Sequence, residues 1–372
     1  MMINKKWLKF IRLLVSNQYT SIGGQAVMEG VMMRSPNAFV VAVRLKDGSI
    51  KLRRDQWFSL SKKINFLKLP FLRGILILIE TMCNGIVALN YSVNQFEDPA
   101  EVMDGSSAKK KEKLTDSQMD WSIVLSMASG IVLSILLFVF LPHGLTYLLT
   151  HVFTLDWQLD GVAFHLMDGI FKACIFILYI YLIGKIPDVK RVFEYHGAEH
   201  KSIATFEGKE DLVVSNAKKY TTLHPRCGTT FMFFLLFIGI ILFTVIFVIF
   251  PVGLNLPPLL KHLVALLYKI LLMFPIAGIS YELIKVAGKY PNHFLTKIIS
   301  FPGMMLQKLT TKEPDEKQLE VALCSIRAVL FLEEKYELNK AQNKILEKEE
   351  VVIKSIDEME KTTSSLKDFL EG

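Results

Sequence analysis

The stretch TFMFFLLFIGIILFTVIFVIF, residues 230–250, carries no charged side chain and is almost entirely apolar. A helix needs about 20 mostly apolar residues to cross a bilayer, so this segment is long enough to do so. Comparable runs recur along a chain of 372 residues that is 51% hydrophobic. Soluble cores do not need such runs, and the sequence therefore predicts a mainly α-helical, polytopic membrane protein that resides in the lipid bilayer.

Three further segments are long and apolar enough to span, and they cover residues 122–141, 162–182 and 259–281. We therefore expect about four transmembrane helices within residues 122–284. A fifth apolar segment, residues 69–91, differs because it contains Arg73, Glu80, Asn84 and Asn90. Polar groups at membrane depth are tolerated where they face protein or a cavity.

Basic residues predict the orientation of these helices. Residues 143–160 contain no Lys or Arg, which is typical of an outside loop, whereas residues 185–226 contain many, which is typical of the cytoplasmic side. Residues 1–68 and 95–120 are also basic, so both ends of residues 69–91 favour the cytoplasm. We expect a re-entrant or interfacial helix there, with a fifth crossing as the alternative. Both termini are expected in the cytoplasm, with the chain in the cytoplasmic membrane.

Soluble regions flank the predicted membrane helices. Residues 1–68 should begin with a membrane-surface helix and end in a small β-hairpin, because AFVVAVRL and IKLRRDQWF flank an Asp-Gly turn. Residues 92–121 read as a flexible cytoplasmic loop, and residues 285–332 as a cytoplasmic helix region. Residues 333–372 should form a charged helical tail, because apolar residues keep a roughly helical spacing at Ile345, Val352, Ile356, Met359 and Leu366.

Composition narrows the range of partners. The formal net charge is +7, but Lys and Arg are clustered as the positive-inside rule requires, without a basic stripe interleaved with aromatics. We therefore expect no nucleic-acid partner, whereas the C-terminal helices offer a surface for an unknown protein partner. The four cysteines include no CxxC pair, so a disulfide framework is not expected.

The segment VFEYHGAEHKSIATFE, residues 192–207, contains the pattern H-x-x-E-H at His196, Glu199 and His200. Residues three and four apart share one face of a helix, so both imidazoles and the carboxylate would face one point. Two imidazoles suit zinc or a similar divalent metal, and the carboxylate can act as a general base. Glu207 follows two turns later on the same face and is a further candidate ligand.

The remaining ligands are expected from the segment YTTLHPRCGT, residues 220–229, because His224 and Cys227 lie there just before a predicted span. Arg226 could stabilise an anionic transition state. Residues 185–229 thus form an inner-face metal-site loop. The site is closed and structural if the metal is bound by all four of His196, His200, His224 and Cys227. If one of them does not coordinate the metal, a position stays open for catalysis. The plainer alternative is a pair of solvated histidines at a helix end.

Several blocks together, namely GGQAVMEGVMMRSP, EYHGAEHKSI, HPRCGT, YELIK and LTTKEPDEKQLEVAL, resemble the YqhQ family. This is a bacterial multi-pass membrane family of unknown function that is described as a predicted metal-dependent enzyme. The resemblance runs over residues 22–328 and implies the same fold and a cytoplasmic membrane location. It also draws attention to Gln25, Glu29, Arg34 and Glu282.

Three functions remain open from the sequence. The first is a membrane-embedded metal-dependent hydrolase, with Glu199 and Arg226 as catalytic residues. The second is a non-enzymatic scaffold or assembly factor with a structural metal. The third is a transporter, which has less support because Asp168 and Lys172, four apart on one predicted span, can neutralise each other.

Overall fold

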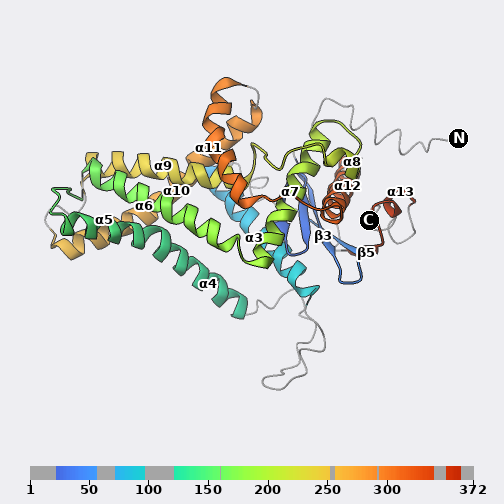
Figure 1. Ribbon diagram of the computed structural model, residues 1–372, viewed down its shortest axis with the longest axis horizontal. Coiled ribbons are helices and arrows are strands. Elements are labelled where there is room, and N and C mark those ends of the chain that lie inside the picture. The colour runs from blue at the N-terminus through green and yellow to red at the C-terminus, as the bar shows by residue number, and fades with distance from the viewer. Residues whose placement is uncertain are drawn as a thin grey trace, which may run out of the picture.

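A bundle of long helices stands beside a smaller module built on a β-sheet (Figure 1). The computed structural model describes residues 22–56, 72–96, 121–159, 161–251, 256–290, 293–338 and 349–361. Five helices in these ranges are long and apolar enough to cross a membrane, which confirms the mainly α-helical, polytopic prediction.

Four of these candidate spans make up the bundle. The first runs through α4 (Trp121–Ile135), a π-helical stretch (Leu136–Phe140) and α5 (Leu141–Val152). The others are α6 (Val162–Ile183), α9 (Gly228–Ile249) and α10 (Pro258–Lys289). Their outward side chains are largely apolar, as lipid contact requires, and a core of aromatic and aliphatic residues around Phe164, Phe234 and Phe247 holds them together.

The fifth candidate is α3 (Leu72–Asn94), which covers the segment predicted to be re-entrant or interfacial. It is one uninterrupted helix and therefore has no re-entrant reversal. Near its start, the Arg73 Nε atom donates a 2.7 Å hydrogen bond to Glu282 in α10. Near its end, the Ser92 hydroxyl accepts one of 3.2 Å from the Met28 N–H of the sheet module. These contacts join α3 to the end of α10 at one side and to the sheet at the other.

The sheet has five antiparallel strands in the order β1-β2-β3-β4-β5, namely Gly23–Val27, Gly30–Arg34, Ala38–Arg44, Ile50–Gln56 and Glu349–Ile353. Strands β3 and β4 are the predicted hairpin, which is confirmed. Its turn needs a glycine, because Gly48 has a φ of 87°. The preceding glycine-rich segment forms a second hairpin, β1-β2.

Both faces of this sheet are covered (Figure 1). Helices α7 (Pro187–Glu207) and α12 (Glu316–Leu338) pack on one face, over residues such as Val31, Val40 and Leu52. Helix α3 covers the other face, where Ala88 and Tyr91 form a buried cluster with Val41 of the sheet. The sheet is thereby fixed between the candidate spans and the C-terminal helix. Helix α12 is itself buried along most of its described length.

Of the predicted helical tail over residues 333–372, residues 333–338 are helical as the end of α12, but the prediction is wrong at Glu349–Ile353, which form a strand. Strand β5 pairs Ile353 with Ile50, and only the short α13 (Glu358–Lys361) is helical after it. Val351 and Ile353 are buried while Val352 is exposed, which is the two-residue period of a half-buried strand. The predicted N-terminal surface helix and most of the predicted loop, residues 97–120, lie outside the described residues.

Between the bundle and α12 lies α11 (Phe294–Thr310), in the region predicted to be helical and cytoplasmic. It packs on α9 through Gly303, where an added Cβ would lie 2.7 Å from a Thr230 methyl group. Its other face exposes a row of large apolar side chains, namely Phe294, Leu295, Ile298, Ile299 and Phe301. The helix is thus amphipathic without being a candidate span.

Candidate metal centre

The first half of the site lies on α7, which is separated from α6 by three residues and has Pro187 in its first turn. The motif is helical throughout, so His196, Glu199 and His200 share one face as predicted. The glycine inside the motif has a packing reason: a Cβ on Gly197 would clash with the carbonyl oxygen of Lys312. This close approach brings the end of α11 against the motif.

The second half of the site is the turn that precedes α9, where Cys227 occupies the N-cap position. The Thr229 N–H donates a 3.3 Å hydrogen bond to the Cys227 sulfur, which fixes the direction of the thiol. The Sγ atom of Cys227 lies 3.2 Å from Nε2 of His196. Ligand atoms of His196, His200 and Cys227 all lie within 4.8 Å of one another, so these three residues converge.

Backbone carbonyls fix which nitrogen each imidazole presents. Nδ1 of His196 lies 2.9 Å from the Thr310 carbonyl oxygen, and Nδ1 of His200 lies 2.5 Å from that of Thr222. Because a carbonyl only accepts, both Nδ1 atoms carry the proton and both Nε2 atoms keep a lone pair. Burial also lowers the pKa of His200, which favours the neutral imidazole. This is the arrangement of histidines that bind a metal through Nε2.

His224 and Glu207, predicted as ligands, contact each other and lie outside this converging group. Nε2 of His224 lies 3.4 Å from Glu207, whose carboxylate also forms an ion pair with Arg226. The buried side chain of Gln307 holds the His224 backbone, accepting a 2.8 Å hydrogen bond from its N–H and donating one of 2.7 Å to its carbonyl. The described part of the chain thus brings three of the five predicted ligands together.

Glu199 is buried beside the converging group, with one carboxylate oxygen 3.9 Å from Nε2 of His196. Burial raises the pKa of its carboxyl, while the charges of nearby imidazoles and a hydrogen bond from the Gly24 N–H oppose this shift. A Cβ at position 24 would lie 2.8 Å from both Cγ of Glu199 and the sulfur of Met33, so any larger residue there would force these groups to shift. Strand β1 therefore touches the candidate base directly.

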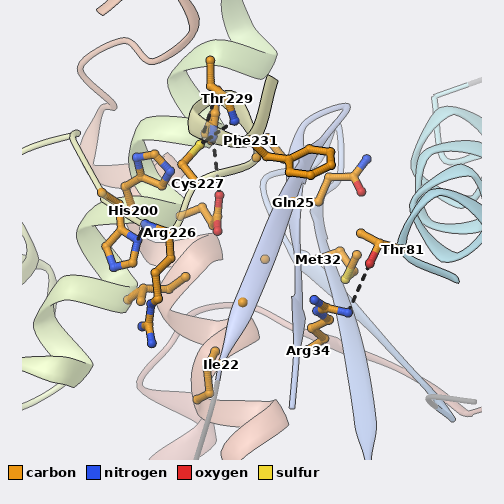
Figure 2. Close-up of a pocket in the computed structure, with 18 of the residues that line it drawn as sticks. Ile22, Gln25, Met32, Arg34, Thr81, His200, Arg226, Cys227, Thr229 and Phe231 are labelled. Carbon is orange, nitrogen blue, oxygen red and sulfur yellow. Dashed lines mark hydrogen bonds and ion pairs between the residues drawn. The ribbon is translucent and has the colours of Figure 1, made fainter. Parts of the chain in front are cut away.

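A cavity of about 450 Å³ adjoins these groups. Figure 2 shows His200, Arg226 and Cys227 on one side and Gln25, Met32 and Arg34 on the side of the sheet. Gln25 and Arg34, which the family resemblance had pointed to, line the part of the cavity beside α3, where Arg34 contacts Thr81 and the Gln25 amide lies against Gly85. The other two residues singled out with them are paired elsewhere: Glu29 with Arg191 and Glu282 with Arg73.

Several supporting residues were missed by the sequence reasoning. Thr222 and Thr310 act through backbone carbonyls, which leave no mark in a sequence. Gln307 had a usable signal, because an amide on an apolar stretch of helix needs a partner when it is buried. Gly24 had a weaker signal in the Gly-Gly pair at the start of its strand.

Comparison with known proteins shows that the residues matched by one family model include both halves of this site. The family model described as "Protein of unknown function (DUF1385)" matches residues 69–331. "Uncharacterized protein YqhQ" from Bacillus subtilis (strain 168) is 33% identical over 323 residues, which is 85% of this chain and 94% of that protein. No solved structure matches. The resemblance drawn from the sequence blocks is confirmed, and the chain belongs to the YqhQ (DUF1385) family, whose function is unknown.

Proposed function

We propose that this membrane protein is a metal-dependent hydrolase, with a zinc ion held by His196, His200 and Cys227. The observation that supports this most is the convergence of one ligand atom from each residue within 4.8 Å. Two imidazole nitrogens and a sulfur are a donor set that zinc prefers. Three protein ligands are typical of catalytic zinc, whereas structural zinc sites use four.

The site's residues divide the work of hydrolysis. A bound zinc would supply a Lewis acid that polarises the bond to be broken. Glu199 is placed to take a proton from the attacking water and return it to the leaving group, so that the hydroxyl stays on the attacked centre. Arg226 lines the cavity and, held by Glu207, is placed to stabilise negative charge that develops there.

We place the site at the cytoplasmic face of the cytoplasmic membrane, with both termini in the cytoplasm. This orientation is supported by the many basic residues in the segment 185–226, which includes the α7 motif and most of the loop before Cys227. It is also supported by the lack of Lys and Arg in residues 143–160. Cysteine accessibility to an impermeant thiol reagent in intact cells tests it. A cysteine placed at Thr154, in the outer connection, should react, and one placed at exposed Lys209 should not.

The Glu199→Gln variant tests the catalytic role. It should keep its zinc and lose activity or complementation by a factor of about 10²–10⁴, as expected when a general base is removed. Glu194→Gln is the matched control, because Glu194 lies on the same helix and contacts Gln318 outside the cavity. Full function in Glu199→Gln would contradict the catalytic role.

One observation favours the alternative of a non-enzymatic scaffold or assembly factor with a structural metal. The imidazole ring of His224 has its centroid 5.6 Å from that of His200, so a rotation away from Glu207 could bring a fourth ligand to the site. Under that alternative Glu199→Gln would be silent, while His224→Ala would lose its zinc. The two variants together separate the two functions.

A further inference from the structure

We propose that the cavity beside the His–Cys cluster binds an anionic membrane lipid, with its hydrocarbon chain against α3, α9 and α10 and its anionic group near Arg34 and Arg226. This lipid would be the substrate of the hydrolase, so its role as substrate rests on the proposed function. The binding of the lipid does not, because it depends on the walls of the cavity rather than on the metal.

The position of the cavity is the first argument. Its wall includes Phe231 from α9 together with Tyr281 and Ile284 from α10, and both helices are candidate spans. Phe231 lies in the first turn of the α9 span, and Ile284 lies near the end of the α10 span. The cavity therefore lies where the membrane bundle meets the sheet module, at the level of the bilayer surface.

The chemistry of the wall is the second argument. Ile77 and Leu78 of α3 face the same space as Phe231 and Ile284, and Val192, Phe193 and Ile203 of α7 continue the apolar lining. Ligand cavities of some 300–1,000 Å³ that are mostly apolar with a few polar groups are typical of binding sites. A water-soluble metabolite would leave such a wall without a partner, whereas a hydrocarbon chain would cover it.

Helix α3, which lines the cavity, and helix α11, which packs on α9, are both suited to lie in the membrane surface. Helix α3 turns Ile79 and Met82 outward, each about half exposed, on the face opposite its sheet contacts. Helix α11 exposes its own apolar row, with Phe294 72% exposed. Amphipathic helices of this kind insert their apolar face at the boundary between head groups and chains. A lipid could then enter the cavity sideways, past α3, without leaving the bilayer.

The charges around the cavity are the third argument. Its described lining contains two arginines, Arg34 and Arg226, and one carboxylate, Glu199; just outside the lining, Arg226 is paired with Glu207, and Glu80 lies near Arg34. Arg34 is oriented by a 3.3 Å hydrogen bond from Nη1 to the Thr81 hydroxyl. A guanidinium binds phosphate or carboxylate oxygens with paired hydrogen bonds, which makes it the usual residue for such groups. The polar end of the cavity thus favours an anionic head group.

Photo-crosslinking tests this inference directly. The probe is a lysophosphatidic acid with a diazirine in its acyl chain, added to the full chain in nanodiscs of neutral phosphatidylcholine. Peptide mass spectrometry should find the label at Ile77, Leu78, Phe231 or Ile284. A monoacylglycerol with the same diazirine chain is the neutral control, and it should label these positions at least about tenfold less, as should Arg34→Gln with the anionic probe.

A matched pair of variants guards against effects on folding. Ile284→Trp fills the cavity and should abolish the label there, while Leu267→Trp, a substitution on the lipid-facing side of the same helix, should leave it unchanged. Label confined to lipid-facing residues such as Leu267 would overturn the inference. Displacement of the probe by glycerol 3-phosphate as effective as displacement by unlabelled lysophosphatidic acid would also overturn it, because the cavity would then recognise the head group alone.

The same samples separate this inference from the hydrolase proposal. Zinc content is measured alongside the label, and the label is also measured in His200→Ala. His200→Ala should keep the label although it loses zinc, and label in the cavity of an unaltered protein that contains no zinc would support the lipid site and contradict the hydrolase. Zinc bound by a protein that is never labelled in the cavity would do the reverse.

Discussion

The Nε2 atom of His196 lies 3.2 Å from the Sγ atom of Cys227, although 31 positions separate the two residues in the chain. His196 lies on α7, which follows directly from α6, and Cys227 caps the start of α9. The packing of α6 against α9 therefore sets the distance between the two halves of the site. The candidate metal centre depends on the bundle as well as on its own residues.

Variants of three of the four candidate donor residues should distinguish an open site from a closed one. His196→Ala and Cys227→Ala should each weaken zinc binding by more than about 100-fold, since even changes to residues that only orient a ligand cost about 10–100-fold. His224→Ala should bind zinc within a few-fold of the unaltered protein, because Nε2 of His224 faces Glu207. Competition with a zinc chelator measures all three. Equal loss in all three variants would indicate a closed, four-ligand site.

Gly24→Ala should impair the site through contact alone. The added methyl group would lie 2.8 Å from Cγ of Glu199, so the carboxylate or β1 must shift. We expect a loss of stability of about 1–3 kcal/mol together with reduced activity. Gly23→Ala is the matched control, since its nearest neighbour, Nε of Arg34, would lie at an ordinary 3.6 Å. Thermal unfolding and an activity or complementation assay report both effects, and equal behaviour of the two variants would contradict this geometry.

The sequence was sufficient for features that depend on local spacing. The segment of residues 230–250 predicts a spanning helix by length and composition alone, and His196 and His200 share a face because they lie four apart. The choice among donors depends on distant groups and could not be predicted. Gln307 holds the backbone of His224, and Glu207 attracts its imidazole.

Strand β5 shows the same limit in the fold. Five residues with one alternation are a weak signal, and their partner, β4, lies near the other end of the chain. The ion pair predicted between Asp168 and Lys172 was incomplete for the same reason. Lys269 of α10 lies closer to the Asp168 carboxylate, at 2.7 Å, and contacts His143 of α5 at 3.1 Å.

The pairing of β5 predicts an asymmetry between neighbouring residues. Ile353→Ala should lower the free energy of unfolding by about 2–5 kcal/mol, because Ile353 is buried in the core under the sheet. Val352→Ala, on the exposed side of the same strand, should change it by less than about 0.5 kcal/mol. Thermal unfolding in detergent measures both. A helical tail would not produce this alternation.

The effects on stability of substitutions at Lys269 and Asp168, in the buried ion cluster of the bundle, should be strongly coupled. Lys269→Met leaves Asp168 with Lys172 alone, at 3.7 Å, and should cost about 3–5 kcal/mol. Combining it with Asp168→Asn should cost less than the sum of the single changes, since the carboxylate that lost its closer partner is then removed as well. A double-mutant cycle on thermal stability measures the coupling, and simple additivity would show that the two residues do not interact.

The coordination shell of the bound metal tests the central claim most directly. X-ray absorption at the zinc edge of the purified protein should show one sulfur at about 2.3 Å, two imidazole nitrogens at about 2.0–2.1 Å and one further light atom that is not imidazole. The imidazole signal should fall in His200→Ala, whereas Glu199→Gln should leave the spectrum unchanged. Three imidazoles and one sulfur, or a purified protein that binds no zinc, would contradict the account.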